Sequence, residues 1–329
     1  DDIYAAELLK FDGQKLKIVE DPNATGLIYD IAIDHSDNVW VVGRYRAPSV
    51  YNGQEWTRYS KGFPDGDFRQ WGLGEDMNGK MWIGGGGTDG VLYSYDDGQW
   101  NRAMSFAELG ANNKWTGFEA IFQASDGNLF AGVYGVGGDV GGDKGGIFRQ
   151  TTGGKWIKEN DSPRIYGFHQ AINGDVLAID DRKGLLKRTN GKWHSVLPID
   201  VPGIRYSEKL SSGFAEQPEG IFWLPTNKGL LRIEGDFWYF MSVAEGLPNN
   251  NVRTVARDNK GNIWVGTEFG VTHFKPQKHP RPPALKVTKI DGEDVESNIE
   301  SEGSKFLYQT GRPFVSIERI GGDFQTTTQ

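Results

Sequence analysis

The sequence predicts an all-β fold, a propeller built from four-stranded blades. Three observations support this prediction: two hairpin signatures alternate along the chain, their spacing is regular, and Gly and Trp are frequent, at 46 and 11 of 329 residues. Glycine and aromatic residues at regular intervals are typical of short strands joined by tight turns. A repeat of about 40 to 48 residues with four strands per unit is typical of propeller blades.

The first signature is a strand, a tight turn and a second strand centred on a large apolar residue. In its clearest copy the turn is Asp258-Asn259-Lys260-Gly261, where Gly261 can adopt a positive φ. The six copies are Ile28–Gly43, Arg69–Gly85, Gly117–Val133, Ile165–Ile179, Leu210–Pro225 and Val252–Thr267. Aligned on the turn, their large apolar residues are Trp40, Trp82, Phe130, Leu177, Trp223 and Trp264. We expect these residues to pack between neighbouring blades.

The second signature is a hairpin with an Asn-Gly, Asp-Gly or Gly-Gly type of turn, which is a strong local hairpin signal. It follows the first five copies at Val50–Tyr59, Leu92–Ala103, Ile147–Glu159, Leu185–Val196 and Leu230–Met241. The sixth unit lacks this hairpin, but Ala6–Asp21 has the same pattern. We therefore expect six blades, with the N-terminal strands closing the ring and removing its open edges. A seventh blade, containing the N-terminal pair and two C-terminal strands, is the alternative.

The pattern changes near the C-terminus, which divides the chain into a propeller at residues 1–278 and a second region at 279–329. The proline-rich stretch Pro276–Pro283 predicts a stiff linker. A hairpin around Asp291-Gly292 and strands at Lys305–Thr310 and Pro313–Ile320 follow. These strands predict a partial β-sandwich, or else the strands that complete a seventh blade.

Composition excludes several function classes. The net charge is −8 and no polybasic stripe is present, so nucleic acid is not an expected partner. The chain has no Cys, which excludes disulfides and thiolate chemistry. No run of 18 apolar residues occurs, so no membrane span is expected in this chain.

The loop Arg44-Tyr45-Arg46, between the second and third strands of its unit, is a candidate ligand-binding element. Two guanidinium groups around an aromatic ring suit a carboxylate or a sugar. An ordinary solvated loop is the alternative for this stretch.

Two connectors between blades carry aromatic residues outside the repeat positions. Arg69 and Trp71 begin the inner strand of the second unit, and Trp115 precedes that of the third. Aromatic rings at a channel mouth can stack on the C–H face of a sugar, although local packing is an equal alternative. We expect Tyr166 and His169 at the matching strand start of the fourth unit. Arg182 lies in its next loop.

Evidence for a metal or for catalysis is thin. The glycine-rich insertion Gly135–Gly146 contains Asp139 and Asp143, which could donate oxygen ligands to Ca²⁺; a mobile lid or plain loop is the alternative. The five His lack metal-binding spacing, and no catalytic residue or other cofactor is assigned.

The stretch ARDNKGNIWVGTEFGVTHF and the connector GLPNNNVRTV before it resemble the two-component regulator propeller repeat. RPPALKVTKIDGEDV resembles the opening of the triple-tyrosine β-sandwich that follows such propellers. The resemblance implies a periplasmic or extracellular sensor domain of a histidine kinase or hybrid kinase, often one that detects oligosaccharides. Signalling would then pass through packing against a partner protomer, as in a homodimer.

We therefore expect a ligand-binding sensor domain with an oligosaccharide at one propeller face. Two other functions stay open. One is an enzyme acting on glycans, either glycosidase-like or similar to virginiamycin B lyase, for which only His169 is suitably placed. The other is a protein-interaction scaffold, which a large apolar face would favour.

Overall fold

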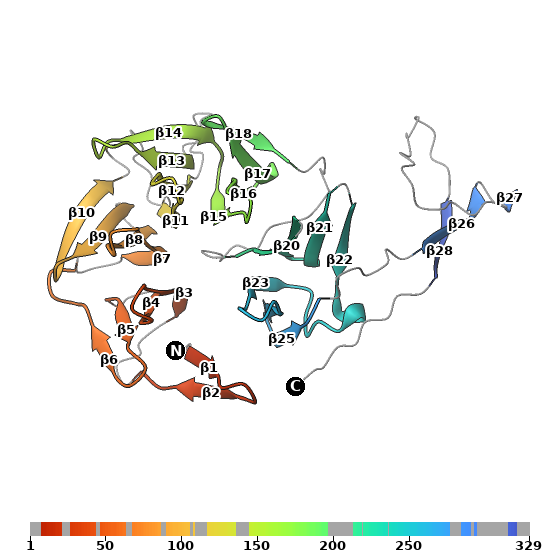
Figure 1. Ribbon diagram of the computed structural model, residues 1–329, viewed down its shortest axis with the longest axis horizontal. Coiled ribbons are helices and arrows are strands. Elements are labelled where there is room, and N and C mark those ends of the chain that lie inside the picture. Colours follow the sequence, from red (N-terminus) through yellow and green to blue (C-terminus); the bar gives the residue numbers. More distant parts are fainter. Residues whose placement is uncertain are drawn as a thin grey trace.

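The computed structural model describes residues 8–21, 27–43, 47–63, 68–86, 90–105, 108, 117–135, 145–196, 213–218, 220–235, 237–276, 284–290, 293–294 and 315–320. Antiparallel sheets follow one another around a ring, with β3, β7, β11, β15 and β23 facing its centre (Figure 1). The prediction of an all-β fold is confirmed. A short 3₁₀ turn, η2 (Val243–Glu245), is capped by Ser242.

Successive sets of four strands make up most of the ring. The first set is β3 (Ile28–Ile33), β4 (Val39–Gly43), β5 (Ser49–Tyr51) and β6 (Trp56–Arg58). The second set is β7 (Arg69–Glu75), β8 (Met81–Gly86), β9 (Val91–Asp96) and β10 (Gln99–Ser105). The third set is β11 (Gly117–Gln123), β12 (Leu129–Tyr134), β13 (Gly146–Gln150) and β14 (Trp156–Asp161).

The fourth set is β15 (Ile165–Gln170), β16 (Val176–Asp180), β17 (Gly184–Thr189) and β18 (Lys192–Ser195). The fifth set is β19 (Ala215–Gln217), β20 (Ile221–Thr226), β21 (Gly229–Glu234) and β22 (Phe237–Met241). The closing sheet has three strands, β23 (Val252–Arg257), β24 (Ile263–Thr267) and β25 (Gly270–Phe274). These are the hairpins that the two signatures predict, with β19 shorter than expected.

Apolar clusters lie between neighbouring sheets and hold the ring together. Trp40, Leu73 and Ile83 belong to a cluster shared by the first two sets, and Phe118 packs with Trp82 between the second and third. Further clusters join the third set to the fourth, and the fourth and fifth to the closing sheet. Five of the six large apolar residues therefore pack between sheets, as their periodic spacing predicts, whereas Trp264 belongs to none of these clusters.

The repeat tryptophans are fixed to the turn that precedes them. The indole Nε1 of Trp40 donates to Asp34 at 2.8 Å, and Trp264 donates to Asp258 at 3.0 Å. In the third and fourth sets the tryptophan is replaced by Phe130 or Leu177, and Ala124 or Ala171 occupies the Asp position. The acceptor is thus lost together with its donor. This correlation explains why the sequence signature weakens in the middle of the chain.

The N-terminal strands β1 (Leu8–Phe11) and β2 (Leu16–Val19) form a two-stranded sheet. In Figure 1 this hairpin lies between the closing sheet and the first set. Among the described strands it pairs only with itself and does not extend β25, in contrast to the expected pairing. Its contact with the closing sheet is made by Phe11, whose ring lies 4.9 Å from that of Trp264.

The C-terminal strands form their own sheet, in the order β27 (Glu293–Asp294), β26 (Ala284–Ile290) and β28 (Val315–Ile320). The predicted hairpin around residues 291–292 is present, since Lys289 pairs with Asp294. The predicted strand at 305–310 lies outside the described residues. Among the described residues, no helix is both long and apolar enough for a membrane span.

Candidate functional site

The innermost strands share a β-bulge at one position. In each of five sets the register with the neighbouring strand skips one residue. A bulge leaves that residue out of the ladder and redirects its side chain. The bulged residues are Tyr29, Trp71, Glu119, Tyr166 and Arg253. All are large and polar or aromatic, although the bulge itself demands neither property.

These bulged residues occupy equivalent places near the start of β3, β7, β11, β15 and β23. Because these strands face the centre of the ring (Figure 1), the bulges lie around one end of the central axis. We call this end the mouth. Each bulged residue lies 11 positions before the large apolar residue of its repeat. The equivalent position in the fifth set, residue 212, lies outside the described residues.

The best-defined part of the mouth is an ion pair between Glu119 and Arg164, which comes just before β15. Arg164 Nε lies 2.5 Å from Glu119 Oε2, and Nη2 lies 2.7 Å from Oε1. The guanidinium also lies over the rings of Tyr134 and Tyr166, at 4.8 and 4.7 Å from their centroids. Burial opposes the charge of Arg164, but Glu119 more than compensates and raises the Arg164 pKa. The pair is therefore charged and internally neutralised.

Tyr166 adds a neutral hydroxyl beside this pair. Its side chain is buried, and its OH donates to Asp181 Oδ1 at 2.6 Å. Burial, followed by the bond to Asp181, raises the pKa of the phenol, so it stays protonated. Asp181 is exposed in the turn between β16 and β17 and offers carboxylate oxygens to solvent.

Trp71 supplies an aromatic surface that also contacts Tyr134. The two rings are 6.4 Å apart in an edge-on arrangement, and Trp71 is half-buried. The indole lies against the backbone of Gly117, where an added Cβ would come within 2.2 Å of the ring. Gly117 therefore allows Trp71 its position, and part of the indole remains open to solvent.

Arg253 holds the corresponding place in the closing sheet. Its Nη2 lies 3.1 Å from Glu268 Oε1 in the turn between β24 and β25. As at Glu119 and Arg164, a charge of the mouth is balanced by a partner at the same end of the ring. Tyr29 occupies the bulge of the first set and is half-buried.

The structure brings several predicted residues to the mouth. Trp71 and Tyr166 are bulged residues, Arg69 begins the same strand as Trp71, and Arg182 is exposed beside Asp181. The predicted residues Arg44, Tyr45, Arg46, Trp115, Asp139 and Asp143 lie outside the described residues.

His169 is displaced from the position expected for it. It lies near the end of β15, where Nε2 is 3.3 Å from Glu216 Oε2 and the ring packs on Phe214. Burial lowers the His169 pKa despite the carboxylate. His169 lies three residues after Tyr166 along β15, so it contacts Glu216 of β19 toward the opposite end of the ring.

Glu119, Arg164 and Tyr134 are not among the residues predicted from the sequence. The repeat alignment contained a signal for Glu119, because the constant separation of 11 residues marks the bulge position. Arg164 and Tyr134 lie outside that position and carry no equivalent signal. Only the fold shows that Arg164 meets both Glu119 and Tyr134.

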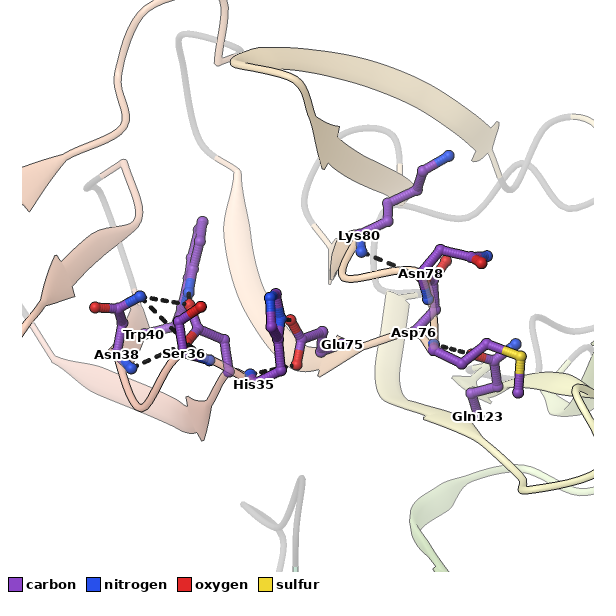
Figure 2. Close-up of polar contacts among 11 residues, drawn as sticks. His35, Ser36, Asn38, Trp40, Glu75, Asp76, Asn78, Lys80 and Gln123 are labelled. Carbon is purple, nitrogen blue, oxygen red and sulfur yellow. Dashed lines mark hydrogen bonds and ion pairs between the residues drawn. The ribbon is translucent and has the colours of Figure 1, made fainter.

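The opposite end of the ring, which we call the turn face, carries a repeated contact between sets. A backbone N–H in the turn after one inner strand donates to a side chain ending the next inner strand. His35 N donates to Glu75 Oε2 at 2.8 Å, and Met77 N donates to Gln123 (Figure 2). Ser125 N and Ile172 N continue the series, donating at 2.8 Å to Gln170 and at 2.7 Å to Glu216. These contacts join neighbouring sets of strands at the turn face.

At Glu75 the contact has a second component. His35 Nδ1 lies 2.5 Å from Glu75 Oε1, and the imidazole remains largely exposed (Figure 2). The bond and charge of Glu75 raise the His35 pKa. Within the described part of the chain, no group of three or more His, Cys, Asp or Glu residues is arranged to hold a metal ion.

A family model described as "Two component regulator propeller" matches residues 246–269. This stretch is therefore similar to the repeat of that family. The match covers the connector into β23, the Asp258 turn and β24, which is the stretch with the fullest sequence signature. No curated protein matches the sequence.

Solved structures extend the likeness to the whole ring. The extracellular domain of BT3049 from B. thetaiotaomicron, described as a hybrid two component system, has a TM-score of 0.64 at 18% identity, covering 93% of this chain and 44% of that one. PorZ, a surface component of the type-IX secretion system of Porphyromonas gingivalis, has a TM-score of 0.64 at 15% identity, covering 82% and 43%. This chain therefore spans less than half of either structure.

A smaller protein has a similar fold. A catalytically inactive virginiamycin B lyase from Staphylococcus aureus with quinupristin has a TM-score of 0.62 at 15% identity, covering 81% of this chain and 86% of the lyase. At these identities the comparisons establish the fold, and the propeller prediction is confirmed.

Proposed function

We propose that this chain is an extracellular or periplasmic ligand-binding sensor domain, and that a neutral oligosaccharide binds at the mouth. The repeat at residues 246–269 and the fold shared with the BT3049 extracellular domain support the sensor role. The observation that favours a binding site is the set of bulged residues. Five polar or aromatic side chains leave the strand ladder at the same end of the propeller.

The chemistry of the mouth favours an uncharged, hydroxyl-rich ligand. The Glu119–Arg164 pair neutralises itself, so neither group is an open site for an ionic partner. Tyr166 stays neutral, and the exposed Asp181 can accept hydrogen bonds from sugar hydroxyls. The half-buried indole of Trp71 offers a face on which a sugar ring can stack.

A thermal-shift screen against neutral and acidic glycans, with and without Ca²⁺, tests this proposal. We expect a neutral oligosaccharide to raise the Tm, and the Ca²⁺ arm to report on the candidate ligands Asp139 and Asp143. Mass spectrometry of the glycan after incubation separates binding from turnover. An unshifted Tm across the panel, or cleavage of the shifting glycan, would contradict a binding function.

Substitution of Trp71 then locates the site. Trp71→Ala should weaken binding of the shifting glycan by about tenfold, because stacking on the indole is lost, while the Tm of the free protein changes little. Trp238→Ala is the matched control, since this indole is exposed on the outer strand β22. Equal affinities in calorimetry of Trp71→Ala and the unaltered chain would place the site elsewhere.

A further inference from the structure

The first set of strands leaves one side of its inner strand uncovered. Asp30 accepts the amide of Leu73 in the next set at 2.9 Å, and Ala32 packs on the cluster shared with that set. Because side chains alternate along a strand, Ile31 and Ile33 point to the other side. They are 45% and 67% exposed, which is unusual for isoleucine in an inner strand.

The equivalent residues elsewhere in the ring are buried. The register places Ile31 opposite Val41, and the matching residues of the later inner strands are at most 8% exposed. Those residues are Leu73, Ile121, Phe168, Phe214 and Val255, and each lies nine positions before the large apolar residue of its repeat, as Ile31 does. Each is covered by the preceding set of strands. On the same side of the first set Val41 is fully buried, so the opening is confined to the innermost strand.

The side of the closing sheet that carries Trp264 is also incompletely covered. Trp40, Trp82 and Trp223 are at most 5% exposed because the following set covers them, whereas Trp264 is only half-buried. On the same side of the sheet Thr254 and Ala256 are exposed, and Val271 is 41% exposed. Trp264 stacks on its neighbour His273, and Phe11 of the N-terminal hairpin covers part of that pair.

The N-terminal hairpin has the pattern of an outer strand pair, and no described strand forms an inner pair with it. Leu9 pairs with Ile18 and Phe11 pairs with Leu16, so these four residues share one face. Leu9, Leu16 and Ile18 are about half exposed. Among the described strands, β1 pairs only with β2, and its other edge makes no ladder.

The turn-face contacts also stop here. The position that accepts a backbone N–H in four inner strands is occupied by Arg257 in the closing sheet and Ile33 in the first set. Neither side chain carries an acceptor. No apolar cluster of the described residues joins the closing sheet to the first set. Among the described residues, the seam between β23–β25 and β3–β6 thus lacks both the apolar cluster and the turn-face hydrogen bond that join the other sets.

We infer that this seam is a docking site for a β-hairpin with the inner-pair pattern of this repeat. The hairpin would insert between β23 and β3, pair with the free edge of β1, and thereby complete a four-stranded sheet with β1 and β2. Its apolar side chains would cover Ile31 and Ile33 on one side and Trp264 on the other. A two-stranded segment fits because the outer part of the seam is already occupied by β1–β2.

The test uses the full chain and a labelled peptide of residues 252–268, which is this protein's own inner pair. Fluorescence anisotropy should show saturable binding, and a scrambled peptide should not bind. The variants Leu9→Lys and Ile31→Lys place a charge in the seam and should weaken binding by about tenfold or more. Val196→Lys and Ile172→Lys alter equally exposed apolar residues away from the seam and should leave binding unchanged.

A second measurement lowers the entropic cost of association by joining the hairpin covalently to the chain. Residues 252–268 are fused ahead of Asp1 through a flexible linker, which raises the effective concentration of the hairpin. The fusion should raise the Tm, and Ile31→Lys should cancel the increase. The inference is overturned if neither the peptide binds nor the fusion stabilises, or if the seam variants have no effect. Dimerisation of the chain without peptide, abolished by the seam variants, would show that a second copy occupies the seam instead.

Discussion

The Glu119–Arg164 pair joins two inner strands through groups that are mostly withdrawn from water. The side chains are 10% and 17% exposed, and the guanidinium is also enclosed by Tyr134 and Tyr166. Charges in such a place depend on each other, because loss of one leaves the other buried without its partner. Glu119→Ala should therefore lower the free energy of unfolding by about 3 kcal/mol in urea denaturation.

The matched control for this prediction is an ion pair on the surface. Lys80 lies 3.1 Å from Asp96, and both side chains are substantially exposed. Lys80→Ala should change the free energy of unfolding by less than about 1 kcal/mol, because water screens the pair. Similar losses for the two variants would show that the Glu119–Arg164 pair is also screened by water.

His35 gives the turn face a pH dependence. Its pKa is raised above the ordinary value of 6.5, first by the hydrogen bond to Glu75, then by the charges of Glu75 and Asp34. A raised folded-state pKa means that the contact stabilises fully below the unfolded value and is lost as pH rises through the folded value. NMR titration of the imidazole should give a midpoint above 6.5. Glu75→Gln should lower that midpoint, and equal midpoints would exclude Glu75 as the cause.

At the scale of the strand and its turn, the repeat tryptophans are not equivalent. Trp223 is buried, donates to Gln217 at 2.9 Å, and meets Phe274 of the closing sheet at 5.3 Å. Trp223→Ala should cost about 3–5 kcal/mol of unfolding free energy. Trp264→Ala should cost clearly less, since Trp264 is half-buried at the seam. Equal losses in thermal or urea denaturation would show that Trp264 is covered as fully as its counterparts.

Sequence periodicity predicted the strands well because apolar spacing and glycine turns are local properties. The hairpin at Val252–Thr267 is observed as β23 and β24, and the other units follow the same template. The spacing could not show that β1–β2 would fail to extend β25, since strand pairing depends on what occupies the space between them. It also could not show the meeting of Glu119 with Arg164, which are 45 residues apart.

The candidate site was only partly accessible to sequence reasoning. Trp71 was predicted as a ligand-binding residue because it falls outside the repeat tryptophans. Tyr166 was predicted because it lies at the start of an inner strand. Glu119 occupies the same bulge position but is a common surface residue type. Its burial beside an arginine is a property of the assembled ring.

Over the whole molecule, stability should fall toward the seam. The strands β8, β12, β16 and β20 are paired on both edges and contribute to shared cores, whereas β1 and β25 each pair on one edge among the described strands. Hydrogen exchange followed by mass spectrometry should show the fastest exchange in β1, β2 and β25 and the slowest in the central strands. Uniform protection around the ring would contradict an open seam.

The bulges have a consequence for how this scaffold can be altered. A residue outside the ladder contributes no strand pairing, so its exchange leaves the hydrogen bonds of β7 or β15 in place. The cost of exchanging a bulged side chain is therefore set by the partner that is lost, such as Glu268 for Arg253 or Tyr134 for Trp71. Glu119 and Tyr166 would have to change together with Arg164 and Asp181. Recognition at the mouth can therefore be redesigned together with each side chain's partner, while the strand pairing stays unchanged.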